Sequence, residues 1–127
     1  MRLLLVIGFL ILASDVVSQN VSADQCRQMH KGRYIMESPG GGNIYIKRKR
    51  KKQHEYYLKT GNKYVFSIVW TEDCIYELIF LRGNSKHDRQ FKGNKLKTEI
   101  VHFSYDTYEC VLTDKEGNQF TVLITKR

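Results

Sequence analysis

The sequence predicts an all-β protein, a single small antiparallel meander of about eight strands that closes as a barrel or folds as a sandwich. Short segments in which apolar and polar residues alternate follow one another along the chain, as in half-buried strands. Turns rich in glycine and asparagine separate these segments, and no long stretch has the periodicity of an amphipathic helix. A closed barrel would also remove the exposed sheet edges of such a strand-rich chain.

We expect a strand wherever alternation lies between two turn signals. The strongest turn signal is residues 39–43, a glycine-rich stretch with the only proline of the chain. Residues 114–118 predict a tight loop, and the polar residues 83–94 predict a long irregular connection. The expected strands are residues 32–37, 43–47, 54–59, 63–71, 74–82, 96–104, 107–113 and 119–125.

The hairpin of residues 63–71 and 74–82 is expected to form the core. It contains the bulkiest apolar side chains, including the only tryptophan, and alternation places them on one face of each strand. The same side chains would line the pocket if the barrel holds a ligand. These candidate ligand-binding aromatics are Tyr64, Phe66, Trp70, Tyr76 and Phe80.

The chain has three cysteines, which suggests one disulfide and one free thiol in an exported protein. Cys26 precedes the first strand and can reach the central hairpin, whereas alternation places Cys110 on an apolar face. We therefore predict a Cys26–Cys74 disulfide with Cys110 buried and free. A bond between Cys74 and Cys110, with Cys26 exposed, is the alternative. No metal site is expected, because no cysteine or histidine pair has close ligand spacing.

The N-terminus predicts a secretory signal peptide at residues 1–18, with cleavage after residue 23 as the alternative, because a charged residue, an apolar run and small residues follow one another. The apolar run is shorter than the roughly 20 residues of a membrane-spanning helix. We expect a secreted or periplasmic protein with a lead segment at residues 19–31 and one β domain at residues 32–127. Asn20 begins a glycosylation tripeptide, which matters only in a eukaryotic source.

The formal net charge is +8, and a strongly basic exported domain tends to meet glycans, lipid head groups or nucleic acid. The clearest basic feature is the run at residues 47–52, flanked by Tyr45, Tyr56 and Tyr57, which can stack on bases or sugar rings. A solvated turn is the commoner role of such a run. The candidate polyanion-binding residues, with the cations of the long loop, are Lys47, Arg48, Lys49, Arg50, Lys51, Lys52, Lys86, Arg89 and Lys92.

Three polar residues form a second candidate site for a small ligand. Alternation places Arg48 on the apolar face, and the partner strand can bring Gln53 or Glu55 close to it. Because an unpaired buried charge is costly, Arg48 would need a partner or an anionic ligand, such as the carboxylate of a small molecule. The commoner arrangement is an Arg48–Glu55 ion pair on an exposed hairpin.

Several short motifs lie along nearly the whole chain after the signal segment. They are Cys26, Gly32-Arg33-Tyr34, Ile46-Lys47-Arg48 followed by Gln53 and Glu55, Trp70-Thr71-Glu72-Asp73-Cys74-Ile75-Tyr76-Glu77-Leu78, and Lys92-Gly93. Together they resemble a family of small exported bacterial β-rich proteins of no settled function. The resemblance implies a lipocalin-like fold and a cysteine pair, and it supplies no catalytic residue. The basic run and Cys110 depart from the family pattern.

The sequence contains no recognisable catalytic arrangement. The four histidines, His30, His54, His87 and His102, are scattered, and no serine lies in a nucleophile elbow. Alternation places His102 on the apolar face with Leu96 and Ile100, where a structural histidine is expected. We expect no cofactor.

The expected function is therefore a non-enzymatic barrel that binds a small ligand or a partner in its interior or mouth. Polyanion binding through residues 47–52 is the alternative. The salt dependence of the affinity distinguishes the two functions. Polyanion binding weakens steeply as ionic strength rises, whereas binding in an apolar pocket scarcely changes.

Overall fold

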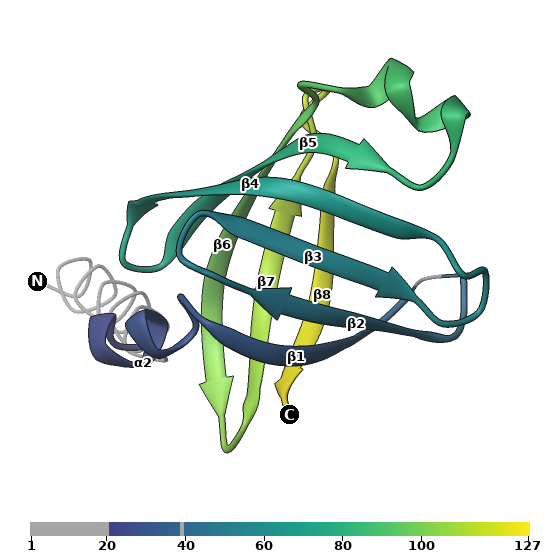
Figure 1. The fold of residues 1–127 in the computed structure, drawn as a ribbon. Helices are drawn as coiled ribbons and strands as arrows, with labels where there is room; N and C mark the ends of the chain where they lie inside the picture. Colours follow the sequence, from purple (N-terminus) through teal and green to yellow (C-terminus); the bar gives the residue numbers. More distant parts are fainter. Residues whose placement is uncertain (1–20, 39) are drawn as a thin grey trace, which may run out of the picture.

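The protein is a closed antiparallel β-barrel in a computed structural model that describes residues 21–38 and 40–127. Each strand pairs with the next along the chain, and β8 pairs with β1 to close the barrel (Figure 1). The strands are β1 (Gly32–Glu37), β2 (Asn43–Arg48), β3 (Lys52–Tyr57), β4 (Lys63–Glu72), β5 (Ile75–Gly83), β6 (Lys95–Ser104), β7 (Thr107–Thr113) and β8 (Gln119–Lys126). The predicted all-β class is confirmed, and the barrel is the form that the chain adopts.

Some predictions fall on residues that are not described. The signal peptide at residues 1–18 and Asn20, the acceptor residue of the glycosylation tripeptide, lie outside the described residues, as does the proline of the first turn. They stay predictions.

Two short helices were missed by the sequence analysis: α2 (Ala23–Gln28) in the lead segment, and the 3₁₀-helix η1 (Lys86–Phe91) in the stretch expected to be irregular. Each begins with a serine capping box, formed by Ser22 with Gln25 and by Ser85 with Asp88. Helices this short bury no repeated apolar face, so periodicity does not reveal them. The capping boxes were the available signal.

The two helices lie at opposite ends of the barrel (Figure 1). Helix α2 lies beside the turns that join β2 to β3 and β4 to β5, at what we call the closed end. Helix η1 joins β5 to β6 at the other end, which we call the mouth. Since alternate strands run in opposite directions, the turns from β1 to β2, β3 to β4 and β7 to β8 also lie at the mouth.

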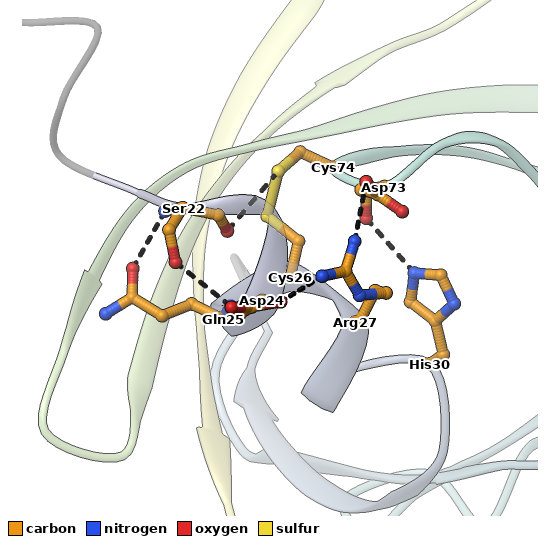
Figure 2. A network of polar contacts seen from close by, with 8 residues as sticks. All are labelled: Ser22, Asp24, Gln25, Cys26, Arg27, His30, Asp73 and Cys74. Carbon is orange, nitrogen blue, oxygen red and sulfur yellow. Dashed lines mark hydrogen bonds and ion pairs between the residues drawn. A yellow bond between two sulfur atoms is a disulfide. The ribbon is translucent and has the colours of Figure 1, made fainter.

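Helix α2 is attached to the barrel by a disulfide and several polar contacts (Figure 2). The Cys26–Cys74 bond is the predicted one, and Cys110 is buried and free, also as predicted. Arg27 donates a hydrogen bond to the Asp73 carboxylate at 2.9 Å, and it also pairs with Asp24 within the helix. These contacts hold the helix over the end of the barrel.

The core lies at the closed end and along the barrel axis. Inward-facing residues of all strands except β3 contribute to it, and Cys26 and Met29 pack against it from the helical segment. The fully buried large side chains include three tyrosines, Tyr34, Tyr76 and Tyr108. The closed end is therefore filled by side chains.

An irregularity in strand β6 corrects the prediction for His102. The pairing of β6 with β7 shifts register between Ile100 and His102. After this irregularity Phe103 packs against the core. His102 lies opposite Glu109, and Glu109 faces outward because its neighbours Tyr108 and Cys110 are buried. His102 therefore lies on the outer face, and the expectation of a histidine on the apolar face was wrong. The bulge adds one residue to the strand and reverses the alternation.

Candidate ligand-binding cavity

Arg48 lies inside the barrel and is only 2% exposed. Its Nε donates to Gln53 Oε1 at 2.9 Å, Nη1 to the carbonyl oxygen of Met29 at 2.9 Å, and Nη2 to the hydroxyl of Tyr76 at 3.1 Å. The guanidinium also lies over the rings of Tyr34 and Tyr76, at 5.1 and 4.8 Å from their centroids. The expected ion pair with Glu55 on an exposed hairpin was therefore wrong, because Gln53 stands between the two charges.

Gln53 links Arg48 to Glu55 through its side-chain amide. Its amide donates to Glu55 Oε2 at 2.7 Å, and the Tyr57 hydroxyl donates a longer bond to Glu55 Oε1 at 3.4 Å. These residues alternate along β3, so their side chains all point into the barrel. A polar chain thus runs along the barrel from Arg48 near the closed end towards the mouth.

Glu55 is a buried carboxyl without a direct cationic partner among the described residues. Burial raises the pKa of the Glu55 carboxyl above its ordinary value of 4.5. The hydrogen bonds from Gln53 and Tyr57 and the charge of Arg48 act in the opposite direction and only partly offset the burial. The carboxylate would be stabilised by a positive group placed beside it.

An interior cavity of about 120 Å³ lies next to this carboxyl. Its wall is mostly aliphatic and aromatic, and the buried Thr98 hydroxyl, also in the wall, makes no hydrogen bond to the described residues. The lining residues are Met36, Ile46, Gln53, Glu55, Tyr57, Phe66, Tyr76, Leu78, Leu96, Thr98, Leu112, Val122 and Ile124. A cavity of this size holds a group about as large as a small ring or short alkyl chain.

A larger hollow of about 540 Å³ occupies the mouth of the barrel and is lined in part by Asp88 and Phe91 of η1. Its aromatic wall is held by edge-to-face contacts, with ring centroids 5.5 Å apart for Phe66 and Phe80 and 5.2 Å apart for Tyr57 and Tyr64. Phe91 of η1 packs on Phe80 at 6.3 Å. The mouth is therefore a funnel with one aromatic wall.

The funnel and the interior cavity adjoin each other, since Tyr57, Phe66 and Leu96 line both. The mouth is also lined by three carboxylates and two lysines, in a protein of formal net charge +8. The local balance is thus negative where the whole molecule is positive. With Glu55 inside, the path into the barrel favours a cation over an anion.

The predicted ligand-binding residues divide into two groups in the structure. Tyr64, Phe66 and Phe80 line the mouth, and Gln53, Glu55, Phe66 and Tyr76 line the interior cavity. Arg48 and Trp70 line neither.

Trp70 lies instead at the closed end. It stacks on His30, with ring centroids 3.5 Å apart, and His30 contacts the carbonyl oxygen of Asp73 at 3.1 Å (Figure 2). The indole lines a separate surface hollow beside α2. Trp70 was grouped with the other aromatics because alternation gives the face of a strand but not the position along the barrel axis.

Sequence reasoning missed Tyr57 and Leu96 as lining residues. Tyr57 shares the face of Gln53 and Glu55 by simple alternation, but it was considered only as a neighbour of the basic run. Leu96 begins the inward face of β6. Alternation would identify both as lining residues if it were known which end of each strand lies at the mouth.

The candidate polyanion residues do not form one surface. Lys47, Lys49, Arg50, Lys51 and Lys52 are exposed near the closed end, whereas Arg48 is buried. The remaining three, Lys86, Arg89 and Lys92, line a hollow of about 530 Å³ beside η1 at the opposite end. The long loop therefore does not assist the basic run.

Neither a metal site nor a membrane-spanning helix is found in the described part of the chain: no three of its histidines, cysteines and carboxylates gather as metal ligands, and no helix has the length and apolar character to cross a bilayer. The disulfide is typical of proteins in oxidising compartments, which fits the predicted export.

No family model, curated protein or solved structure matches the chain. The small β-barrel implied by the resemblance to exported bacterial proteins is present, and membership of that family stays a prediction.

Proposed function

We propose that the barrel is a binding protein for a small amphipathic amine. The ammonium group pairs with the Glu55 carboxylate in the interior cavity, and the apolar body of the ligand lies against Phe66, Phe80 and Leu96 in the mouth. The observation that carries this proposal is the buried Glu55 on the wall of a cavity that adjoins an aromatic funnel. The protein binds without chemical change of the ligand.

The hydrogen bonds of Arg48 argue for an amine rather than a carboxylate. All three guanidinium nitrogens donate to protein acceptors, and Arg48 lines neither the cavity nor the mouth. Glu55 has hydrogen-bond donors from Gln53 and Tyr57 but no counter-ion in contact among residues 21–38 and 40–127. An ammonium ion supplies that counter-ion and further donors, which offsets the cost of the buried charge.

The proposal is tested by isothermal titration calorimetry with hexylamine, hexanol and hexanoate, which share one alkyl chain and differ in the head group. Hexylamine is expected to bind at least about tenfold more tightly than hexanol, and hexanoate most weakly. In Glu55→Gln the preference for the amine disappears. Glu99→Gln, which neutralises an exposed carboxylate on the outside of β6, retains it.

The affinity for hexylamine also depends on pH. It rises as pH increases through the raised pKa of Glu55, because the carboxyl must lose its proton to pair with the ammonium. Equal affinities for amine and alcohol in the wild type, tighter binding of hexanoate, or an unchanged amine preference in Glu55→Gln each overturn the proposal. So does the absence of binding by all three probes.

A further inference from the structure

A second candidate site lies on the outside of the barrel, away from the cavity. A shallow groove of about 360 Å³ crosses the outer face of β2, β3 and β4. We call it the outer groove. Its outward-facing lining residues are Arg33, Tyr45, Lys47, His54, Tyr56, Lys63, Val65 and Arg127.

Two rows of side chains cross the strands in this groove. Cross-strand pairing places Arg33 beside Lys47 and Lys47 beside His54, which gives a basic row. Tyr45 lies two residues before Lys47 on β2, closer to the mouth. It lies directly opposite Tyr56 of β3, and the two tyrosines form an aromatic row. Side chains two residues apart on a strand are roughly 7 Å apart, so the rows run parallel at that spacing.

Cations also stand at both sides of the tyrosine pair. The Arg127 guanidinium lies 4.3 Å from the ring centroid of Tyr45, and the Lys63 ammonium lies 5.7 Å from that of Tyr56. The other outward-facing lining residues are His54 and Val65, and the one acidic lining residue, Glu55, points inward.

The basic row is unfavourable for the protein alone. Arg33 and Lys47 are like charges directly opposite each other on neighbouring strands, an arrangement that destabilises a sheet. His54 sits beside them, where burial first, and then the charges of Lys49, Arg82, Lys52 and Lys47, lower its pKa. A negatively charged ligand would relieve this repulsion.

We propose that the outer groove binds a segment of single-stranded nucleic acid. The backbone phosphates lie along the cations Arg33, Lys47, Lys63 and Arg127, and two neighbouring bases stack on Tyr45 and Tyr56. A groove that combines a phosphate-binding track with aromatic side chains is how proteins bind single strands without sequence preference. A sugar ring can also lie on a tyrosine, but only a base offers a planar π-face for stacking, so two adjacent tyrosine rings favour nucleic acid.

The groove also leads into the exposed part of the basic run. Lys47 belongs to both, and Lys49 and Lys52 follow it at the turn between β2 and β3. A longer strand can therefore continue from the groove onto this turn. Neither Tyr45 nor Tyr56 lines the cavity or the mouth, whereas the inward-facing Ile46 and Glu55 border both the outer groove and the cavity.

The test is fluorescence anisotropy with a labelled oligothymidylate of about eight nucleotides and an abasic oligonucleotide with the same number of phosphates. The wild type is expected to bind the oligothymidylate at least about tenfold more tightly than the abasic strand, since only the former has bases to stack. The logarithm of the affinity should fall with the logarithm of the salt concentration with a slope of about −3, from four phosphate contacts.

Matched variants separate the two rows. The double variant Tyr45→Ala with Tyr56→Ala loses the preference for the strand with bases and keeps the salt slope, whereas Tyr105→Ala, which removes a tyrosine that is 94% exposed on another turn, changes neither. Lys47→Gln reduces the magnitude of the salt slope by about 0.7, because one phosphate contact is lost. Lys97→Gln, on the far strand β6, leaves the salt slope unchanged.

Equal binding of the two oligonucleotides by the wild type overturns the proposal without any variant. So does an unchanged preference in a folded double tyrosine variant. Tighter binding of a heparin octasaccharide than of the oligothymidylate would also overturn it and assign the groove to sulfated glycans.

Discussion

At the scale of single residues, Glu55 is the least expected feature of the barrel interior. A buried carboxyl normally has a cation beside it, but here Gln53 separates Glu55 from Arg48. Arg48 acts as a positioning residue, since its bond to Gln53 orients the amide that donates to Glu55. The orientation of the carboxyl is therefore set by hydrogen bonds from Gln53 and Tyr57.

The raised pKa of Glu55 predicts how stability depends on pH. The folded protein holds this proton more tightly than the unfolded chain, so the contribution of Glu55 is fully present below its ordinary pKa of 4.5 and is lost as pH rises through the folded value. As pH rises above 4.5, the free energy of unfolding of the wild type should fall relative to that of Glu55→Gln, by about 1.4 kcal/mol for each unit of pKa shift.

Urea unfolding across this range provides the measurement, with Glu99→Gln as the control for removing an exposed carboxylate. Parallel stability curves for the wild type and Glu55→Gln would contradict the raised pKa.

At the scale of elements, helices α2 and η1 are attached to the two ends of the barrel in different ways. Helix α2 is covalently bonded to the turn before β5, and its segment fills the closed end with Cys26 and Met29. Helix η1 packs on the rim instead. A side chain on Gly83 would overlap the Asp88 carboxylate of η1, so the glycine lets the helix lie close to the end of β5. Helix η1 is held at the mouth by packing and by hydrogen bonds of its flanking residues, such as the bond from Gly93 N to the Phe80 carbonyl oxygen at 2.9 Å.

The disulfide should contribute substantially to stability. It closes a loop with a sequence separation of 48 residues, for which chain entropy predicts about 4 kcal/mol. The variant with Cys26→Ser and Cys74→Ser is expected to unfold at clearly lower urea than the oxidised wild type. A reductant should lower the wild-type midpoint and leave that of the double variant unchanged.

Cys110 should not interfere with this measurement. Burial raises the pKa of its thiol to about 12, so it remains protonated and unreactive in the folded protein. An oxidised wild type that unfolds at the same urea concentration as the double variant would show that the bond contributes nothing to stability.

At the scale of the whole molecule, the sequence pattern predicted much of the architecture. Alternation and turn residues located the eight strands, with β3 displaced by two residues, and identified the disulfide partners Cys26 and Cys74. It did not predict the bulge near His102, because one inserted residue reverses the alternation without a glycine to mark it. It also did not predict α2 or η1, because six residues are too few to show an apolar period.

The candidate site was predicted only in part, for a geometrical reason. Alternation shows that Arg48, Trp70 and Phe80 face inward, but not at which height along the barrel axis each lies. That height follows from strand register and barrel closure, which separate Arg48 and Trp70 from the mouth. The outer groove likewise depends on the register that brings Tyr45 opposite Tyr56 and Arg33 opposite Lys47.

The whole barrel thus combines a negatively lined path to its interior with a basic outer face. The measurement that tests the interior site most directly is an NMR experiment on the protein with bound hexylamine. We expect nuclear Overhauser effects from the amine to side chains that line the barrel, such as Leu96, and a shift of the Glu55 carboxyl carbon, with both absent in Glu55→Gln. Overhauser effects confined to outward-facing residues, with an unchanged Glu55 carboxyl signal, would contradict the account.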